Sequence, residues 1–193
     1  MGLSPLFIFS ALIAVVVIPE QRLLEAAQGG LVEEVRELLK NSTLNVNFGG
    51  EWGQTALRAA SVNGFGDIVS LLLAHPAINP DKPNTRGETP LWVASGNGTD
   101  GTAPVPLLLK NPHVNVNQAQ REGITPLQAA CLAGNIVTVK WFIASGRVDP
   151  RTVVPTGEEA QVIELLERYT KNPVETRKLI LAELGASEGD EIS

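Results

Sequence analysis

Apolar residues recur along this chain in blocks that are separated by a regular interval. Each block contains a glycine, and an apolar set follows it at positions five, eight and nine: Val35, Leu38 and Leu39; Val69, Leu72 and Leu73; Val139, Phe142 and Ile143. This spacing is typical of one face of a helix. A further set, Val105, Leu108 and Leu109, is displaced by two residues. Each block therefore predicts a helix after its glycine.

A short motif precedes the glycine in three of the blocks. It reads Thr55-Ala56-Leu57, Thr89-Pro90-Leu91 and Thr125-Pro126-Leu127, at intervals of 34 and then 36 residues. Threonine can cap a helix by accepting a backbone N–H, and proline fits the first helical turn. A degenerate copy without the threonine begins near Glu20. The pattern predicts stacked units of two short helices.

A polar connector follows the second helix of each unit. The connectors are Leu44-Asn45-Val46-Asn47, Ile78-Asn79-Pro80-Asp81, Val114-Asn115-Val116-Asn117 and Val148-Asp149-Pro150. An apolar residue followed by Asn or Asp, and then by a glycine-containing turn, favours a projecting hairpin-like loop.

These residues resemble the ankyrin repeat family, whose motif is Thr-Pro-Leu-His-x-Ala, then Gly, then Val-x-x-Leu-Leu. The resemblance covers roughly residues 20 to 155. It implies an all-α solenoid of about four helix-turn-helix repeats. The histidine position carries Leu24, Arg58, Trp92 and Gln128. In the family that imidazole ties neighbouring turns together, so we expect those hydrogen bonds to be absent or replaced here.

The chain divides into four predicted segments. Residues 1–19 form an apolar segment, residues 20–150 the repeats, residues 151–185 a C-terminal helical cap, and residues 186–193 an acidic disordered tail. In the cap, two helices are expected, with apolar stripes formed by Ile163, Leu166 and Tyr169 on the first and by Val174, Leu179, Ile180 and Leu184 on the second.

Residues 1–19 contain no charged side chain. As a helix they would measure roughly 28 Å, close to the ~30 Å hydrocarbon core of a bilayer. A membrane anchor, a cleaved signal and a segment packed on the first repeat remain alternatives. The predicted location is cytoplasmic, or membrane-associated with the repeats facing the cytoplasm.

The composition of the chain excludes several classes of function. The net charge of −6 argues against nucleic acid as a partner, because a binder needs a basic stripe to neutralise phosphates. Two histidines and one cysteine provide too few nitrogen and sulfur ligands for a zinc site. No nucleophile, phosphate-loop or dinucleotide motif appears. We therefore expect no enzyme, no cofactor and no metal, but a monomeric protein-interaction module.

The family resemblance implies that loop tips and first-helix positions contact a protein partner. By offset, these positions are Glu51, Trp52, Gln54, Asn63, Thr85, Arg86, Glu88, Arg121, Glu122 and Ile124, with Val62, Gly96, Asn97, Leu132 and Ala133 at the equivalent helix positions. Trp52 and Arg86 belong to the residue types that dominate interfaces. Alternatively, Trp52 folds back over the first repeat. A linking role is favoured for Trp92.

Overall fold

A computed structural model describes residues 18–97, 104–150, 153 and 160–186. Residues 1–17 of the apolar segment, residues 154–159 before the C-terminal helices and residues 187–193 of the acidic tail lie outside the described residues. The predictions of an anchor and of a disordered tail therefore fall almost entirely outside that part of the chain. No helix among the described residues is both long enough and apolar enough to cross a bilayer.

The described part of the chain is helical, without strands. In chain order the elements are α2 (Pro19–Gln28), α3 (Val32–Leu38), the 3₁₀ helix η1 (Glu51–Gly53), α4 (Ala56–Val62), α5 (Gly66–Leu73), α6 (Pro90–Gly96), α7 (Pro104–Lys110), α8 (Pro126–Leu132), α9 (Ile136–Ser145), α10 (Ala160–Lys171) and α11 (Pro173–Glu183).

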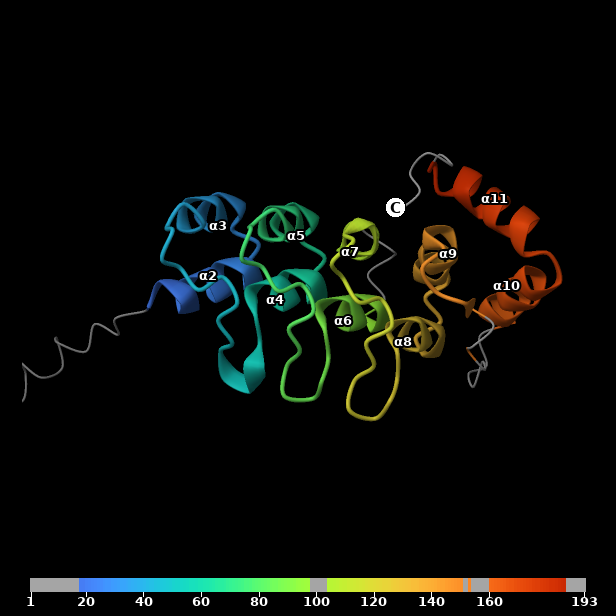
Figure 1. The fold of residues 1–193 in the computed structure, drawn as a ribbon, viewed down its shortest axis with the longest axis horizontal. Helices are drawn as coiled ribbons and strands as arrows, with labels where there is room; N and C mark the ends of the chain where they lie inside the picture. Colours follow the sequence, from blue (N-terminus) through green and yellow to red (C-terminus); the bar gives the residue numbers. More distant parts are fainter. Residues whose placement is uncertain (1–17, 98–103, 151–152, 154–159, 187–193) are drawn as a thin grey trace, which may run out of the picture.

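The repeat helices form two rows (Figure 1). Helices α2, α4, α6 and α8 pack in sequence as an inner row, and α3, α5, α7 and α9 pack in sequence as an outer row. Hairpin loops extend from the inner row, on the side away from the outer row. The expected all-α solenoid of helix-turn-helix repeats is confirmed.

Local chemistry explains where the inner helices begin. The side chains of Thr55, Thr89 and Thr125 accept backbone N–H bonds at the starts of α4, α6 and α8. In α8, Gln128 completes a capping box by accepting the N–H of Thr125 at 2.8 Å. The predicted threonine caps are therefore present in all three repeats.

The core lies between the two rows. The leucine of each motif and most of the apolar stripe of each outer helix are buried: Leu57, Leu91 and Leu127 from the motifs, and Val35, Val69, Leu72, Val105, Leu108, Leu109, Val139, Phe142 and Ile143 from the outer helices. Of the predicted stripes, Leu38, Leu39 and Leu73 are only half-buried against this core. Small residues such as Ala60 and Ala130 are fully buried between them. This close approach of helices suits a core that is poor in aromatic side chains.

The polar connectors form a ladder from one repeat to the next. The side-chain oxygen of Asn47 accepts the backbone N–H of Asn79 at 2.7 Å, and the carboxylate of Asp81 accepts the N–H of Asn115 at 2.9 Å. The Asn47 amide also donates to the carbonyl of Ala77 at 2.7 Å. The recurring Asn and Asp residues thus satisfy backbone groups of the following connector, a role that their sequence pattern alone did not reveal.

The C-terminal helices α10 and α11 pack against α9. The predicted apolar stripe on α11 is wrong in part, because Val174 is 79% exposed and Leu179 is 43% exposed. Ile180 is buried as predicted, and Leu184 is half-buried. Thr176, which was not predicted, is buried as well, and the Arg177 guanidinium donates to the carbonyl of Ala144 in α9. A few side chains around Thr176 and Ile180 therefore make the contact with α9.

On α10 the predicted stripe is also partly out of register. Leu166 is buried as expected, but its buried companions are Val162 and Leu165, whereas Ile163 and Tyr169 are only half-buried.

Candidate functional site

Three hairpins lie side by side along the inner row. They span residues 50–54, 84–88 and 120–124, and in each the first backbone N–H donates to the last carbonyl at 3.0–3.1 Å. Neighbouring hairpins are joined because the N–H of Thr85 donates to the carbonyl of Trp52 at 2.8 Å, and that of Arg121 to the carbonyl of Arg86 at 3.1 Å. These bonds fix the spacing of the loop tips.

Gly87 permits the close approach of the second and third hairpins. Its φ is +82°, and a Cβ atom there would lie 2.9 Å from the backbone nitrogen of Arg121. Only glycine fits this position without moving the backbone of the next hairpin.

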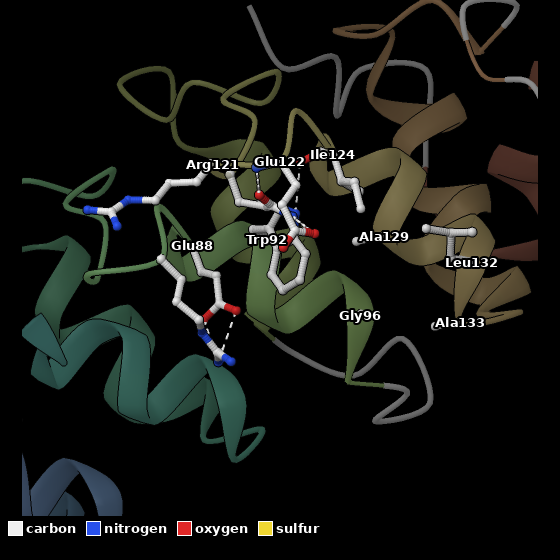
Figure 2. Close-up of a pocket in the computed structure, with 11 residues that line it drawn as sticks. Glu88, Trp92, Gly96, Arg121, Glu122, Ile124, Ala129, Leu132 and Ala133 are labelled. Carbon is white, nitrogen blue, oxygen red and sulfur yellow. Dashed lines mark hydrogen bonds and ion pairs between the residues drawn. The ribbon is translucent and has the colours of Figure 1, made fainter. Parts of the chain in front are cut away.

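Two adjoining hollows lie along the hairpins and the inner helices. The N-terminal hollow, of about 630 Å³, is lined by Trp52, Gln54, Arg58, Asn84, Thr85, Arg86 and Arg121. The C-terminal hollow, of about 510 Å³, is lined by Arg86, Glu88, Trp92, Gly96, Gln120, Arg121, Glu122, Ile124, Ala129, Leu132 and Ala133 (Figure 2). Arg86 and Arg121 line both hollows, which together form one groove.

Most of the residues expected to contact a partner lie along this groove. Those that line it are Trp52, Gln54, Thr85, Arg86, Glu88, Arg121, Glu122 and Ile124. Glu51 and Asn63 do not. Glu51 is exposed in η1, and the side-chain amide of Asn63 donates to the carbonyl of Ala59 at 2.9 Å. The repeat offset therefore brings together residues that are far apart in sequence.

Trp52 does not fold back over the first repeat, since its side chain is 77% exposed. Its φ is +59°, and it is the one non-glycine residue in the described part of the chain with a positive φ. A left-handed backbone costs a tryptophan roughly 1–2 kcal/mol. The alternative in which Trp52 covers the first repeat is wrong.

The sequence of the first hairpin explains this conformation. In the second hairpin Asn84 Oδ1 accepts the N–H of Arg86 at 2.9 Å, and in the third Gln120 Oε1 accepts the N–H of Glu122. Gly50 stands at the equivalent place and has no side chain to hold the N–H of Trp52. The turn of the first hairpin is therefore free to adopt the left-handed backbone at Trp52.

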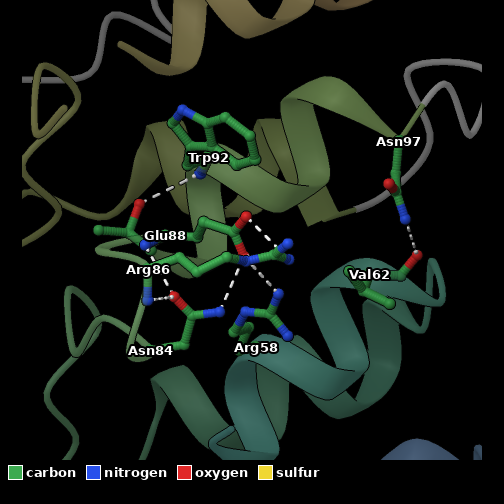
Figure 3. A network of polar contacts seen from close by, with 8 residues as sticks. Arg58, Val62, Asn84, Arg86, Glu88, Trp92 and Asn97 are labelled. Atoms are coloured by element: carbon green, nitrogen blue, oxygen red, sulfur yellow. Dashed lines mark hydrogen bonds and ion pairs between the residues drawn. The ribbon is translucent and has the colours of Figure 1, made fainter. Parts of the chain in front are cut away.

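A charged network lies beneath the groove (Figure 3). Glu88 is only 6% exposed, and its Oε2 accepts hydrogen bonds from Arg58 Nη2 and Asn84 Nδ2, each at 2.8 Å. Arg86 Nη2 lies 3.0 Å from Oε1. Burial alone would raise the pKa of Glu88, but the hydrogen bonds from Arg58 and Asn84 and the charges of the two arginines outweigh it and lower that pKa. Glu88 is therefore a carboxylate at neutral pH.

The unusual residues at the histidine position do link neighbouring repeats. Arg58 bonds to Glu88 in the following hairpin, and Trp92 Nε1 donates to the carbonyl of Ile124 at 2.9 Å (Figure 2). The hydrogen bonds made by the family's histidine are thus replaced at these two positions. The linking role predicted for Trp92 is confirmed, and its indole also lines the C-terminal hollow.

Several groove residues were missing from the sequence-based site. They are Arg58, Asn84, Trp92, Gln120 and Ala129. Asn84 and Gln120 begin their hairpins at the same offset, so the repeat period could have indicated both. Trp92 was assigned to linking alone and Arg58 was given no role in the site, yet both side chains also line the groove.

Within the described residues, no group of three or more His, Cys, Asp or Glu side chains could hold a metal ion. Burial raises the pKa of the Cys131 thiol to about 11, so this cysteine is protonated at neutral pH. It packs as a small apolar side chain in α8.

Comparison with protein families agrees with this architecture. Residues 78–153 match the family model of ankyrin repeats (3 copies). No curated protein matches the chain. Ankyrin repeats are generally protein–protein interaction modules.

Proposed function

We propose that the chain is a non-enzymatic module that binds a partner protein, as a monomer, through the groove formed by the hairpins and the inner helices. Its mechanism is surface complementarity on a preformed face, with no cofactor and no covalent step. The hairpin-to-hairpin hydrogen bonds support this proposal, because they hold the contact residues in place before a partner arrives.

The observation that carries the proposal is the exposure of Trp52. A large aromatic side chain that is 77% exposed, on a left-handed backbone, stabilises neither the core nor the turn. Trp and Arg side chains are the residue types that most often dominate binding energy at interfaces. Trp52 lies beside Arg86 in the wall of the N-terminal hollow, as a contact surface requires.

Replacing the two exposed contact residues should abolish partner binding without unfolding the chain. In the double variant Trp52→Gly with Arg86→Ala, glycine accepts the positive φ, and the loss of the exposed Arg86 ion pair costs about 0–1 kcal/mol. We expect co-purification of bound proteins with the full chain to fall by about tenfold or more. The measurement is quantitative affinity purification from expressing cells, beside far-ultraviolet circular dichroism.

The matched control is Val174→Ala with Lys178→Ala, which removes one exposed apolar side chain and one exposed cation from α11. It should retain full binding. Equal retention of bound proteins by both double variants would refute the proposed surface, and loss of helicity in the first would assign its residues to the fold.

A second candidate function is tethering of a partner at a bilayer, with the repeats facing the cytoplasm. It is favoured by one observation, the lack of any charged side chain in residues 1–19. We expect alkaline carbonate to leave the full chain in the membrane pellet and to extract a variant that starts at Glu20. Extraction of both proteins would rule out the tether and leave the interaction module unaffected.

A further inference from the structure

We propose that the groove binds an acidic segment of the partner protein, whose carboxylates face the N-terminal hollow while an apolar side chain enters the C-terminal hollow. This inference rests on the proposed function and specifies the chemistry of the partner.

The charge of the N-terminal hollow is opposite to that of the chain. Arg58, Arg86 and Arg121 line it, and none of its lining residues is acidic, whereas the whole chain carries a net charge of −6. The buried Glu88 beneath offsets about one of these three positive charges by formal count. The surface that a partner would meet is therefore cationic.

Two of the three guanidinium groups are available to a ligand. The Arg86 side chain is 73% exposed although it pairs with Glu88. Arg121 is exposed, and its guanidinium makes no hydrogen bond or ion pair that is seen among the described residues. A planar guanidinium presents paired donors that match a carboxylate. Gln54, Asn84 and Thr85 add neutral polar groups to the same wall.

The C-terminal hollow differs in chemistry. Three small residues, Gly96, Ala129 and Ala133, line it together with the indole of Trp92 and with Leu132, which is 51% exposed. The small residues leave space above the inner helices, and Trp92 and Leu132 provide apolar walls (Figure 2). Its volume of about 510 Å³ is enough to take an apolar side chain of a partner.

The order of the two hollows sets the pattern of the ligand. Arg86 and Arg121 lie where the hollows meet, so a carboxylate close in sequence to the apolar side chain can reach both guanidinium groups. Glu122 lines the C-terminal hollow and not the N-terminal one, and its carboxylate disfavours acidic residues of a ligand in the C-terminal hollow. An acidic segment with an apolar residue near one end fits this arrangement.

The test selects binders from random peptides of about 12 residues, displayed on phage, against the full chain. We expect the selected peptides to be enriched in Asp and Glu next to an apolar residue. Synthetic copies of the best binders are then measured by fluorescence anisotropy. Arg121→Glu should weaken their binding by about tenfold or more, while the matched charge reversal Lys178→Glu on α11 should change it less than about twofold. Raising NaCl from about 50 mM to about 300 mM should also weaken it.

Other outcomes would overturn the inference in distinguishable ways. Neutral or basic peptides that lose affinity in Trp52→Gly would refute the acidic partner and leave the proposed function standing. Displacement of the acidic peptides by about 10 mM inorganic phosphate would define a small-anion site instead. Displacement by a short oligothymidine would indicate a nucleic-acid surface. Absence of binders, or binders that are insensitive to both Trp52→Gly and Arg121→Glu, would refute the acidic partner and the proposed groove together.

Discussion

Glu88→Ala is expected to lower the free energy of unfolding by about 3–5 kcal/mol, because it leaves the buried Arg58 guanidinium without its counter-ion. Arg58 is 9% exposed and Glu88 is 6% exposed, so neither charge is well solvated in the folded chain. Arg58 Nε already lacks a hydrogen-bond partner among the described residues, so the variant would leave a second nitrogen of this buried guanidinium without its acceptor. The variant should also loosen the second hairpin, since Asn84 donates to the same carboxylate.

Urea unfolding followed by circular dichroism measures this effect. The control Glu122→Ala removes an exposed carboxylate from the third hairpin and should change stability by less than about 0.5 kcal/mol. Combining Glu88→Ala with Arg58→Met should recover part of the loss, because no buried charge then remains unpaired. Equal effects of Glu88→Ala and Glu122→Ala would contradict the buried pair.

Acid should remove the contribution of Glu88. The folded chain lowers the pKa of this carboxyl below its ordinary value of 4.5. The stabilisation is therefore complete above that value and is lost as the pH falls through the lower pKa of the folded state. The difference in Tm between the unchanged chain and Glu88→Gln should shrink on acidification below pH 4.5. A difference in Tm that grows in acid would show that folding raises the pKa of Glu88 instead of lowering it.

Arg147→Met is expected to lower the free energy of unfolding by about 2–4 kcal/mol, because it deprives three carbonyls of a charged donor. The Arg147 guanidinium donates to the carbonyls of Leu109, Asn111 and Val114 at 2.8, 2.9 and 2.6 Å. These carbonyls lie at and just beyond the end of α7, where the helix provides no backbone N–H donors for its last carbonyls. Methionine preserves most of the side-chain volume, so the measured loss reports mainly on the hydrogen bonds.

Thermal or urea unfolding again provides the readout. Arg36→Met on α3 is the matched control, since Arg36 is half exposed and forms an ion pair with the exposed Glu33 at 3.4 Å. The loss in the free energy of unfolding caused by Arg147→Lys should lie between the losses caused by Arg147→Met and Arg36→Met, because a single ammonium group cannot bond to all three carbonyls. If Arg147→Met costs no more than Arg36→Met, the bridge from Arg147 does not stabilise the solenoid.

The period of the sequence predicted the helices and brought most of the groove residues together. A repeat transfers each position by a fixed offset, so the locations of Trp52, Arg86 and Arg121 followed from counting. The contact between Arg58 and Glu88 could not be predicted in this way. It joins residues 30 positions apart in different repeats, and no local pattern encodes it. The same holds for the three carbonyl bonds of Arg147.

The C-terminal helices show a second limit. The apolar residues of α11 are spread around its circumference, so periodicity alone could not select the face that contacts α9. The packing of α9 and the bonds from Arg177 to Ala144 decide that face and leave Val174 in solvent. The positive φ of Trp52 could not be predicted from the repeat pattern either, since it depends on the lack of a side chain at Gly50 in the same turn.

The second hairpin has a mechanical consequence for the whole groove. Its backbone is bonded to the first hairpin through Thr85 and to the third through Arg86, while its Glu88 is tied to the inner helix α4 through Arg58. A displacement of this one loop must therefore change the width of both hollows together. We therefore expect a ligand that seats in one hollow to influence the opening of the other, because this one loop borders both.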